Sequence, residues 1–166
     1  QPGVIERFQR EAQAAAAIDN DHVISVVDFG QFEDGTVYMA LEFLEGCTLA
    51  EELARSGPLS VERLLRIATQ LCEALSAAHA KGILHRDLKP ENVFLTSRKG
   101  QADFVKILDF GIAKILEAGD AKLTSTGAVF GTPHFMSPEQ ARGARDLDQR
   151  SDLFSLGAVL YAALVG

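Results

Sequence analysis

The sequence is poor in cysteine, in basic residues and in long apolar runs, and each shortage argues against a class of protein. Two cysteines in 166 residues are too few for a disulfide framework, which favours a reducing compartment. The formal net charge of −7 leaves no basic field to hold a polyanionic backbone, so nucleic acid is not an expected partner. No stretch approaches about 18 consecutive apolar residues, so no membrane span is expected within this sequence.

What remains is the composition of an ordinary globular domain. Hydrophobic residues make up 47% and charged residues 23% of the chain, and 166 residues suit one domain better than two. The sequence begins at Gln1 without an initiator methionine, and it stops at Gly166 inside an apolar run that has no helix cap. We therefore expect an excerpt, truncated at both ends, of a larger folded unit.

Hydrophobic periodicity and turn residues predict a mixture of helices and short strands. Apolar spacings of three and four indicate helices, whereas short β-rich runs bounded by turn residues indicate strands. The expected elements are a helix over 4–18, a hairpin of strands over 22–30 and 36–43, helices over 49–55 and 60–82, short strands over 82–84, 92–95 and 104–108, and a helix over 151–166. The long helix is expected to begin at an N-cap at Ser60 and to end at Gly82. Its expected buried residues are Leu64, Ala68, Leu71, Leu75 and Ala78.

The run HRDLKPEN, residues 85–92, places groups suited to phosphoryl transfer on a loop between two short strands. That reaction needs positioning and charge neutralisation more than covalent chemistry. A carboxylate such as Asp87 can orient an attacking hydroxyl and accept its proton. Lys89 can neutralise the moving phosphoryl group, and Asn92 can bind a metal ion through its amide oxygen.

A second segment with metal-binding chemistry is Asp109-Phe110-Gly111, which follows a predicted strand. Asp109 can hold magnesium, a hard cation that prefers oxygen ligands. The same tripeptide occurs at Asp28-Phe29-Gly30, where we interpret it as the end of a strand. Only the second copy follows the loop over residues 85–92, here called the catalytic loop. It lies 22 residues after Asp87, and this order distinguishes the two copies.

Four motifs follow one another along the chain: HRDLKPEN, LDFGIAK, GTPHFMSPEQARG and RSDLFSLGAVLY. Together they resemble the bacterial eukaryotic-like, or Hanks-type, serine/threonine protein kinases, over essentially the whole chain. The resemblance implies an α+β, protein-kinase-like fold of two lobes. Residues 1–43 would form a partial N-terminal lobe and residues 44–166 a partial C-terminal lobe. Ser137-Pro138-Glu139 stands where the family has Ala-Pro-Glu.

The resemblance assigns catalytic roles residue by residue. Asp87 corresponds to the catalytic base and Lys89 to the phosphate-contacting lysine of serine/threonine-specific kinases. Asn92 and Asp109 correspond to the magnesium ligands. Asp152 resembles the buried aspartate that ties the last helix to the backbone of the catalytic loop.

The resemblance also implies an ATP site between the lobes. Glu11 resembles the helix glutamate that pairs with a strand lysine holding the α- and β-phosphates, and that lysine is absent from these residues. The run ALEFLEG resembles the hinge, so the Glu42 carbonyl and the Leu44 backbone would contact the adenine edge. Phe94 would lie beneath the base.

Regulation is expected between Asp109 and Ser137. A phosphate on Thr124 or Thr126 would add nearly two negative charges near Arg86, whose planar guanidinium can bind phosphate through two parallel hydrogen bonds. His85, in contrast, is interpreted as a structural residue packed under the loop and not as a base.

The expected function of the parent protein is ATP- and magnesium-dependent phosphorylation of serine or threonine in protein substrates. Its kinase domain would be cytoplasmic. Relatives often carry a membrane span beyond the kinase domain. The 166 residues alone are expected to be inactive, since they lack a glycine-rich loop and the strand lysine that would pair with Glu11. They are also expected to be poorly soluble, because half of a small sheet would be exposed with unpaired edges. One alternative is a non-catalytic kinase-like binding or scaffolding module. Another is a small-molecule kinase of the aminoglycoside or choline type, which lacks the segment seen here at 119–139.

Overall fold

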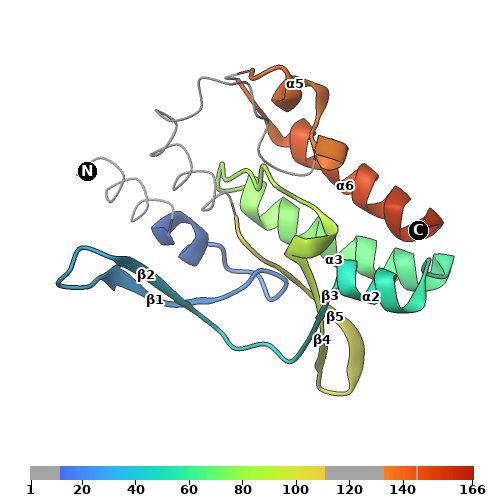
Figure 1. Cartoon of the computed structure of the whole chain (residues 1–166), viewed down its shortest axis with the longest axis horizontal. Helices are drawn as coiled ribbons and strands as arrows, with labels where there is room; N and C mark the ends of the chain where they lie inside the picture. The colour runs from blue at the N-terminus through green and yellow to red at the C-terminus, as the bar shows by residue number, and fades with distance from the viewer. Residues whose placement is uncertain (1–11, 111–132, 145) are drawn as a thin grey trace.

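The structure is a computed structural model that describes residues 12–110, 133–144 and 146–166 (Figure 1). Residues 12–16 are helical, within the predicted helix over 4–18. The elements that follow are β1 Val26–Gln31, β2 Val37–Leu41, β3 Gly46–Thr48, α2 Leu49–Ser56, α3 Val61–His79, the 3-10 turn η1 Pro90–Asn92, β4 Val93–Arg98, β5 Gln101–Ile107, the 3-10 turn η2 Pro133–Phe135, α5 Pro138–Ala141 and α6 Gln149–Val165.

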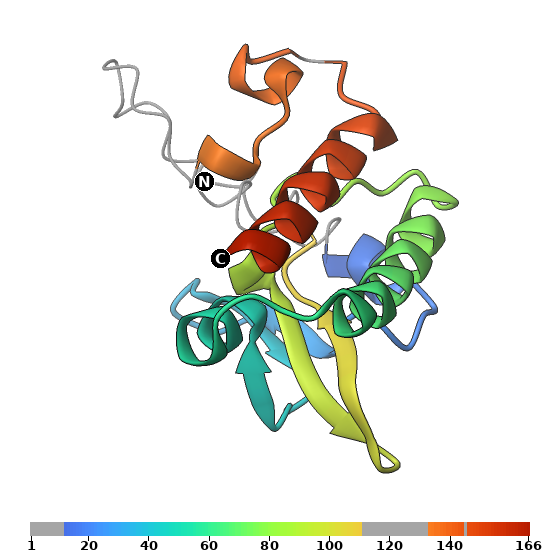
Figure 2. The same cartoon turned by 90° about the vertical axis from the view of Figure 1, so that its right-hand side faces the viewer.

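Two antiparallel sheets and three longer helices make up the described architecture. Strands β1 and β2 form a two-stranded hairpin, and β3, β4 and β5 form a three-stranded sheet in that order. Figure 1 shows the β1–β2 hairpin apart from α2, α3 and α6, and in the turned view of Figure 2 the hairpin lies behind β3 and α2. This arrangement confirms the predicted α+β class. None of the helices in the described ranges is both long and apolar enough to span a bilayer.

One hydrophobic cluster joins the beginning of the described chain to its end. Ala15, Ile18 and Val23 belong to the same buried cluster as the core faces of α3 and α6. Four of the five residues predicted for the buried side of α3 are buried, and Ala68 is half-buried. The periodicity argument was therefore accurate, and the first residues of the chain share this core.

The ends of α3 show why one predicted strand is absent. Ser60 caps the start of the helix, as predicted, by accepting a hydrogen bond from the Arg63 N–H. At the other end the Gly82 N–H donates to His79 O and the Ile83 N–H donates to Ala78 O, the paired bonds of a Schellman motif. Because the Ile83 N–H completes the helix end, residues 82–84 do not form the predicted strand.

The segment before β1 is hydrogen-bonded to β5, far along the chain. The Ile107 N–H donates to His22 O over 2.8 Å, and the Ile24 N–H donates to Ile107 O over 3.0 Å. The Lys106 ammonium donates to Val23 O over 3.1 Å. Residues 22–24 are therefore fixed to the three-stranded sheet and not to the β1–β2 hairpin.

A charged cluster joins α2, α3 and the β4–β5 hairpin. Arg63 donates two parallel hydrogen bonds to the Asp103 carboxylate, over 2.9 and 2.6 Å, and a third to Glu52 over 2.6 Å. Glu52 is only 4% exposed, and the hydrogen bond from Arg63 holds the pKa of its carboxyl below the ordinary value. Because Arg63 bonds to both Asp103 and Glu52, the cluster fixes the relative positions of these elements. Removing Arg63 would be costly, since it would leave a buried carboxylate without this partner.

Gly46, at the start of β3, allows the chain to leave the segment over 42–45 and pair with β4. Its φ is +149°, and a Cβ atom there would lie 2.1 Å from the backbone oxygen of Leu95. We expect Gly46→Ala to lower the free energy of unfolding by about 2 kcal/mol or more, because both strain and a backbone clash oppose it. Urea unfolding measures this change. Gly100→Ala is the control, since Gly100 has a φ of +81° but open space around it. Equal losses in both variants would contradict the clash.

Candidate active site

A buried aspartate on α6 supports the loop that carries the predicted catalytic residues. Asp152 is 1% exposed, and its carboxylate accepts hydrogen bonds from the backbone N–H groups of His85 and Arg86 over 2.9 and 2.8 Å. The His79 ring nitrogen Nε2 lies 2.7 Å from the same carboxylate. The predicted tie between Asp152 and the catalytic loop is therefore present in the structure.

His85 joins the catalytic loop to the strand end that precedes Asp109. The Asp87 N–H donates to His85 Nδ1 over 3.2 Å, so the ring proton lies on Nε2, which donates to Leu108 O over 2.9 Å. Burial lowers the pKa of His85, because it disfavours the imidazolium more than the Leu108 carbonyl and nearby carboxylates favour it. A buried, neutral ring with both nitrogens engaged fits the structural role predicted for His85.

The lowered pKa of His85 predicts how stability depends on pH. Below the ordinary histidine pKa of 6.5 the unfolded chain takes up a proton that the folded chain does not. The free energy of unfolding should therefore fall as the pH falls from above about 6.5 to below it. Thermal melting of the complete kinase-like domain across this window should show the slope, and His85→Phe should reduce it. An unchanged slope in that variant would contradict the prediction.

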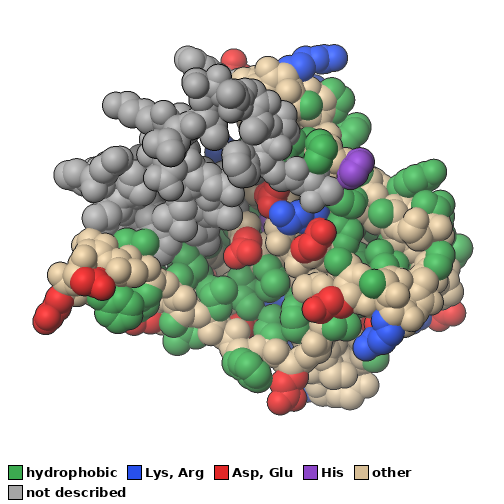
Figure 3. All heavy atoms as spheres, in the orientation of Figure 1, with side chains coloured by type: hydrophobic (Ala, Val, Ile, Leu, Met, Phe, Trp, Pro, Cys, Tyr) green, Lys and Arg blue, Asp and Glu red, His purple; other side chains and the backbone are tan. Residues whose placement is uncertain are grey.

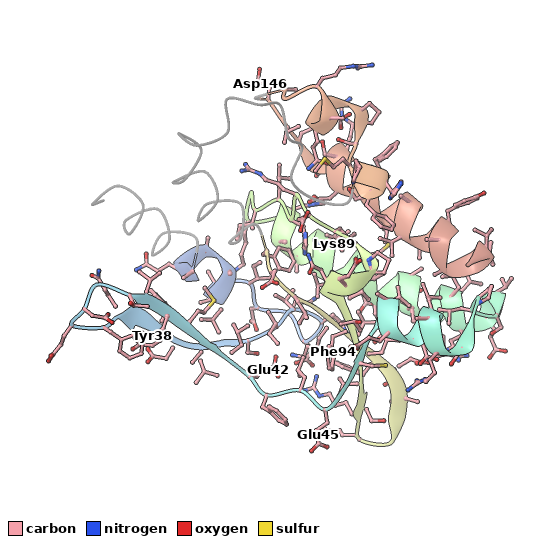
Figure 4. All side chains as sticks on the ribbon, viewed as in Figure 1. Tyr38, Glu42, Glu45, Lys89, Phe94 and Asp146 are labelled. Atoms are coloured by element: carbon pink, nitrogen blue, oxygen red, sulfur yellow. The ribbon has the colours of Figure 1, made fainter. Side chains whose placement is uncertain are left out.

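Asp87, Lys89 and Asn92 meet within the loop, where Asp87 and Lys89 are half-buried and Asn92 is buried. The Lys89 ammonium lies 2.9 Å from Asp87 Oδ2. The Asn92 amide nitrogen donates to Asp87 O over 2.8 Å and lies 3.3 Å from Asp87 Oδ2. Acidic and basic side chains meet near the centre of the face in Figure 3, and Lys89, labelled in Figure 4, lies in this region. The structure thus gathers a carboxylate, a cation and an amide around one point.

The structure places Asp109, the second predicted magnesium ligand, directly after a residue that is hydrogen-bonded to the catalytic loop. Asp109 is exposed and has a φ of +55°, an uncommon conformation for a residue other than glycine. The Leu108 N–H donates to Asn92 O over 2.9 Å, which brings the residue before Asp109 against the catalytic loop. Since the Asn92 nitrogen donates to Asp87, its oxygen is the atom that can bind a cation. No cluster of three or more His, Cys, Asp or Glu side chains suited to a metal occurs among the described residues.

The predicted magnesium ligands fit that ion. Magnesium is held in phosphoryl-transfer sites by one or two protein oxygens together with phosphate oxygens and water, not by a full cage of side chains. Asp109 offers a carboxylate and Asn92 an amide oxygen, both hard ligands.

The side chain of Glu42, in the predicted hinge, is bonded to Ser25 and Lys106 and so holds the backbone of this segment in place. Its carboxylate accepts hydrogen bonds from the Ser25 N–H over 2.7 Å and from the Lys106 ammonium over 2.5 Å. Burial raises the pKa of Glu42, but the bonds from Lys106 and Ser25 outweigh burial and hold it below the ordinary value. Glu42 N–H also donates to Ser25 O over 3.0 Å. The backbone carbonyl of Glu42 therefore belongs to a fixed segment.

Leu44 and Phe94 lie on either side of the junction between this segment and the three-stranded sheet. Leu44 precedes β3, and Phe94 of β4 pairs with Thr48 at the other end of β3. A Cβ atom on Gly46 would lie 3.0 Å from the Phe94 ring. Glu42, Glu45 and Phe94 lie near one another in the lower part of Figure 4. The remaining predicted site residues, Glu11, Thr124 and Thr126, lie outside the described residues.

Comparison with known proteins identifies the family. The family described as the protein kinase domain matches residues 2–166. The chain belongs to the protein kinase family. Among curated relatives, serine/threonine-protein kinase pkn3 of Myxococcus xanthus is 51% identical over 98% of this chain, and PknB of Mycolicibacterium smegmatis is 41% identical over 99%. This kinase chain spans 30% of the length of pkn3 and 26% of the length of PknB.

Solved kinase structures agree with the fold. The kinase domain of Mycobacterium tuberculosis PknI matches with a TM-score of 0.75 and 30% identity, covering 99% of this chain and 58% of that one. Rad53 in complex with AMP-PNP matches with a TM-score of 0.73 and 26% identity, covering 95% of this chain and 37% of that one. The predicted kinase-like fold, in truncated form, is thereby confirmed.

Two side chains of this kinase site were not singled out as functional by the sequence analysis. Lys106 is a lone cation between buried residues of β5, and a buried ammonium requires a partner. That pattern was a usable signal, although it does not name Glu42 as the partner. The partner of His79 is Asp152, which lies 73 residues away along the chain, so no local pattern reveals their contact.

Proposed function

We propose that the protein containing this chain is an ATP- and magnesium-dependent kinase that phosphorylates serine or threonine in other proteins. The observation that carries the proposal is the convergence of Asp87, Lys89 and Asn92 on a loop held by the buried Asp152. The names of the curated relatives support the protein-kinase class. A lysine two residues after the catalytic aspartate supports serine/threonine specificity.

In the proposed reaction, the hydroxyl oxygen of the substrate attacks the γ-phosphorus of ATP and its proton passes to Asp87. The bond from the γ-phosphorus to the bridging oxygen breaks, and ADP leaves with the bonding electrons. Lys89, 2.9 Å from Asp87 Oδ2, would contact both the carboxylate and the transferring group. Asn92 and Asp109 would hold magnesium, whose charge offsets that of the phosphates when it is bound.

The nucleotide would lie between the β1–β2 hairpin and the three-stranded sheet. The backbone of Glu42 and Leu44 would contact the adenine edge, and Phe94 would form the surface beneath it. Lys106 and Ser25 support this role of Glu42 because they hold its side chain in place. Glu11 would act in phosphate binding through a lysine. These roles assume a division into an N-terminal lobe over 1–43 and a C-terminal lobe over 44–166.

Regulation by phosphorylation at Thr124 or Thr126 is part of the proposal, with Arg86 as the binding partner of the phosphate. Arg86 is exposed and adjoins Asp87, so an interaction at Arg86 acts on the catalytic loop. The kinase domain would work in the cytoplasm.

The test is a transfer assay with the complete kinase domain, γ-labelled ATP, magnesium and a generic protein substrate such as myelin basic protein. Label on serine or threonine, identified by mass spectrometry, supports the proposal. Binding of nucleotide without transfer of label, under conditions in which a known serine/threonine kinase is active, would favour a non-catalytic binding module.

The metal assignment predicts that Asp109→Asn acts through magnesium. Removing one charged ligand should lower the transfer rate at about 1 mM magnesium by roughly tenfold or more, and higher magnesium should recover part of it. Titration of the rate against magnesium measures this effect. Asp28→Asn is the control, because Asp28 stands in the other Asp-Phe-Gly tripeptide and contacts Tyr38 instead. The same magnesium dependence in Asp109→Asn and in wild type would contradict the assignment.

A further inference from the structure

The short helix α5 carries a glutamine whose side chain makes bonds in two directions. The Ser137 N–H donates to the Gln140 side-chain oxygen over 3.1 Å, and the Gln140 N–H donates to Ser137 Oγ over 3.3 Å. These reciprocal bonds form a capping box at the start of α5. The box uses only the oxygen of the Gln140 amide. The amide nitrogen donates to the backbone oxygen of Arg86 over 2.7 Å, 54 residues away.

The peptide that receives this bond leads directly into Asp87. Its carbonyl group is the Arg86 oxygen bound by Gln140, and its N–H is the Asp87 nitrogen that donates to His85 Nδ1 over 3.2 Å. Arg86 has a φ of +65°, an uncommon conformation for a residue other than glycine. Both polar groups of this peptide are therefore held by side chains, one from α5 and one from the loop itself. Their directions fix the orientation of the Asp87 backbone.

The amide at position 140 is explained by this contact and not by the cap. A capping box accepts glutamate as well as glutamine, and the positive end of a helix dipole favours the carboxylate. A carboxylate at position 140 would still accept from Ser137, but it has no hydrogen to donate to the Arg86 carbonyl. The neutral amide satisfies both partners.

We propose that Gln140 is a positioning residue for phosphoryl transfer, which couples α5 to the peptide before Asp87. The expected effect of Gln140 on the transfer rate rests on the proposed kinase function. Its expected effect on the loop rests on geometry alone. Asp152 and Gln140 then hold the same turn from two separate segments: Asp152 binds its N–H groups and Gln140 its carbonyl.

The test compares Gln140→Glu with Ser137→Ala in the complete kinase domain. Gln140→Glu keeps the cap but loses the donor to Arg86, so we expect a melting temperature near that of wild type and a fall in kcat of about tenfold. The KM for ATP should change by less than about twofold, since the hinge is untouched. Ser137→Ala removes the capping hydroxyl but leaves the donor. It should therefore lower the melting temperature more than Gln140→Glu does and lower kcat less.

Gln140→Met serves as a second variant of similar size that lacks both functions, and it should lose both stability and rate. Amide hydrogen exchange over residues 85–88 gives a readout that needs no activity, and we expect it to rise in Gln140→Glu. Wild-type kcat and wild-type exchange in Gln140→Glu would overturn the inference. An equal loss of kcat in Ser137→Ala would also overturn it, by assigning the effect to the cap. An inactive wild-type domain would refute the proposed function, and the exchange measurement would still decide the role of Gln140.

Discussion

Asp87→Asn in the complete kinase domain is expected to lower kcat by a factor of about 10² to 10⁴, the range for losing a general base. The substitution keeps the side-chain volume and removes the negative charge, so the acceptor for the substrate proton is lost. The bond from Asn92 to the Asp87 backbone oxygen does not depend on that charge, so the loop should keep its shape. Initial rates at saturating ATP and substrate measure the change.

The control for this variant is its folding and nucleotide affinity. A melting temperature within a few degrees of wild type and an unchanged affinity for ATP would assign the loss to chemistry. A rate within about twofold of wild type would contradict the role of Asp87 as base.

The second large effect is expected from Asp152→Ala, and it falls on stability first. The carboxylate is buried and accepts from the His85 and Arg86 N–H groups, so its removal leaves these donors unsatisfied beneath the loop. We expect the free energy of unfolding to fall by about 3 to 5 kcal/mol, the cost of breaking a buried charged network. Denaturant unfolding of the complete domain measures this loss. Phosphoryl transfer should fall as well, because the same donors position Asp87.

Asp148→Ala is the matched control, since Asp148 is exposed and caps the same helix by accepting from the Arg150 N–H. Its loss should be smaller and should leave the transfer rate close to that of wild type. If the two variants proved equally stable, Asp152 would be no more than another helix-end residue.

The sequence predicted the elements of this fold where periodicity reports burial directly. The core face of α3, the hairpin around Gly35 and the apolar α6 followed from spacing and turn residues. β3 was missed because three residues are too few to show alternation. The strand expected over 82–84 was wrong because apolar residues there complete the end of a helix.

For the site, the order of motifs indicated which residues matter but not what holds them. Asp87, Lys89 and Asn92 fall within one loop, so their meeting was foreseeable from sequence alone. The supports come from distant segments: Gln140 reaches Arg86 across 54 residues, and Lys106 reaches Glu42 across 64. Periodicity indicates that a polar residue is buried, but it does not name the partner. The pairing of Arg63 with Asp103 was missed for the same reason.

The attachment of residues 22–24 to β5 has a mechanical consequence. The chain enters the β1–β2 hairpin at Ser25 and leaves it at Glu42, and the two crossings are hydrogen-bonded to each other in both directions. The hairpin is thus connected to the three-stranded sheet through two adjacent pivots, not one. Sliding of the hairpin along the sheet would break the bonds that Lys106 makes to Val23 and Glu42.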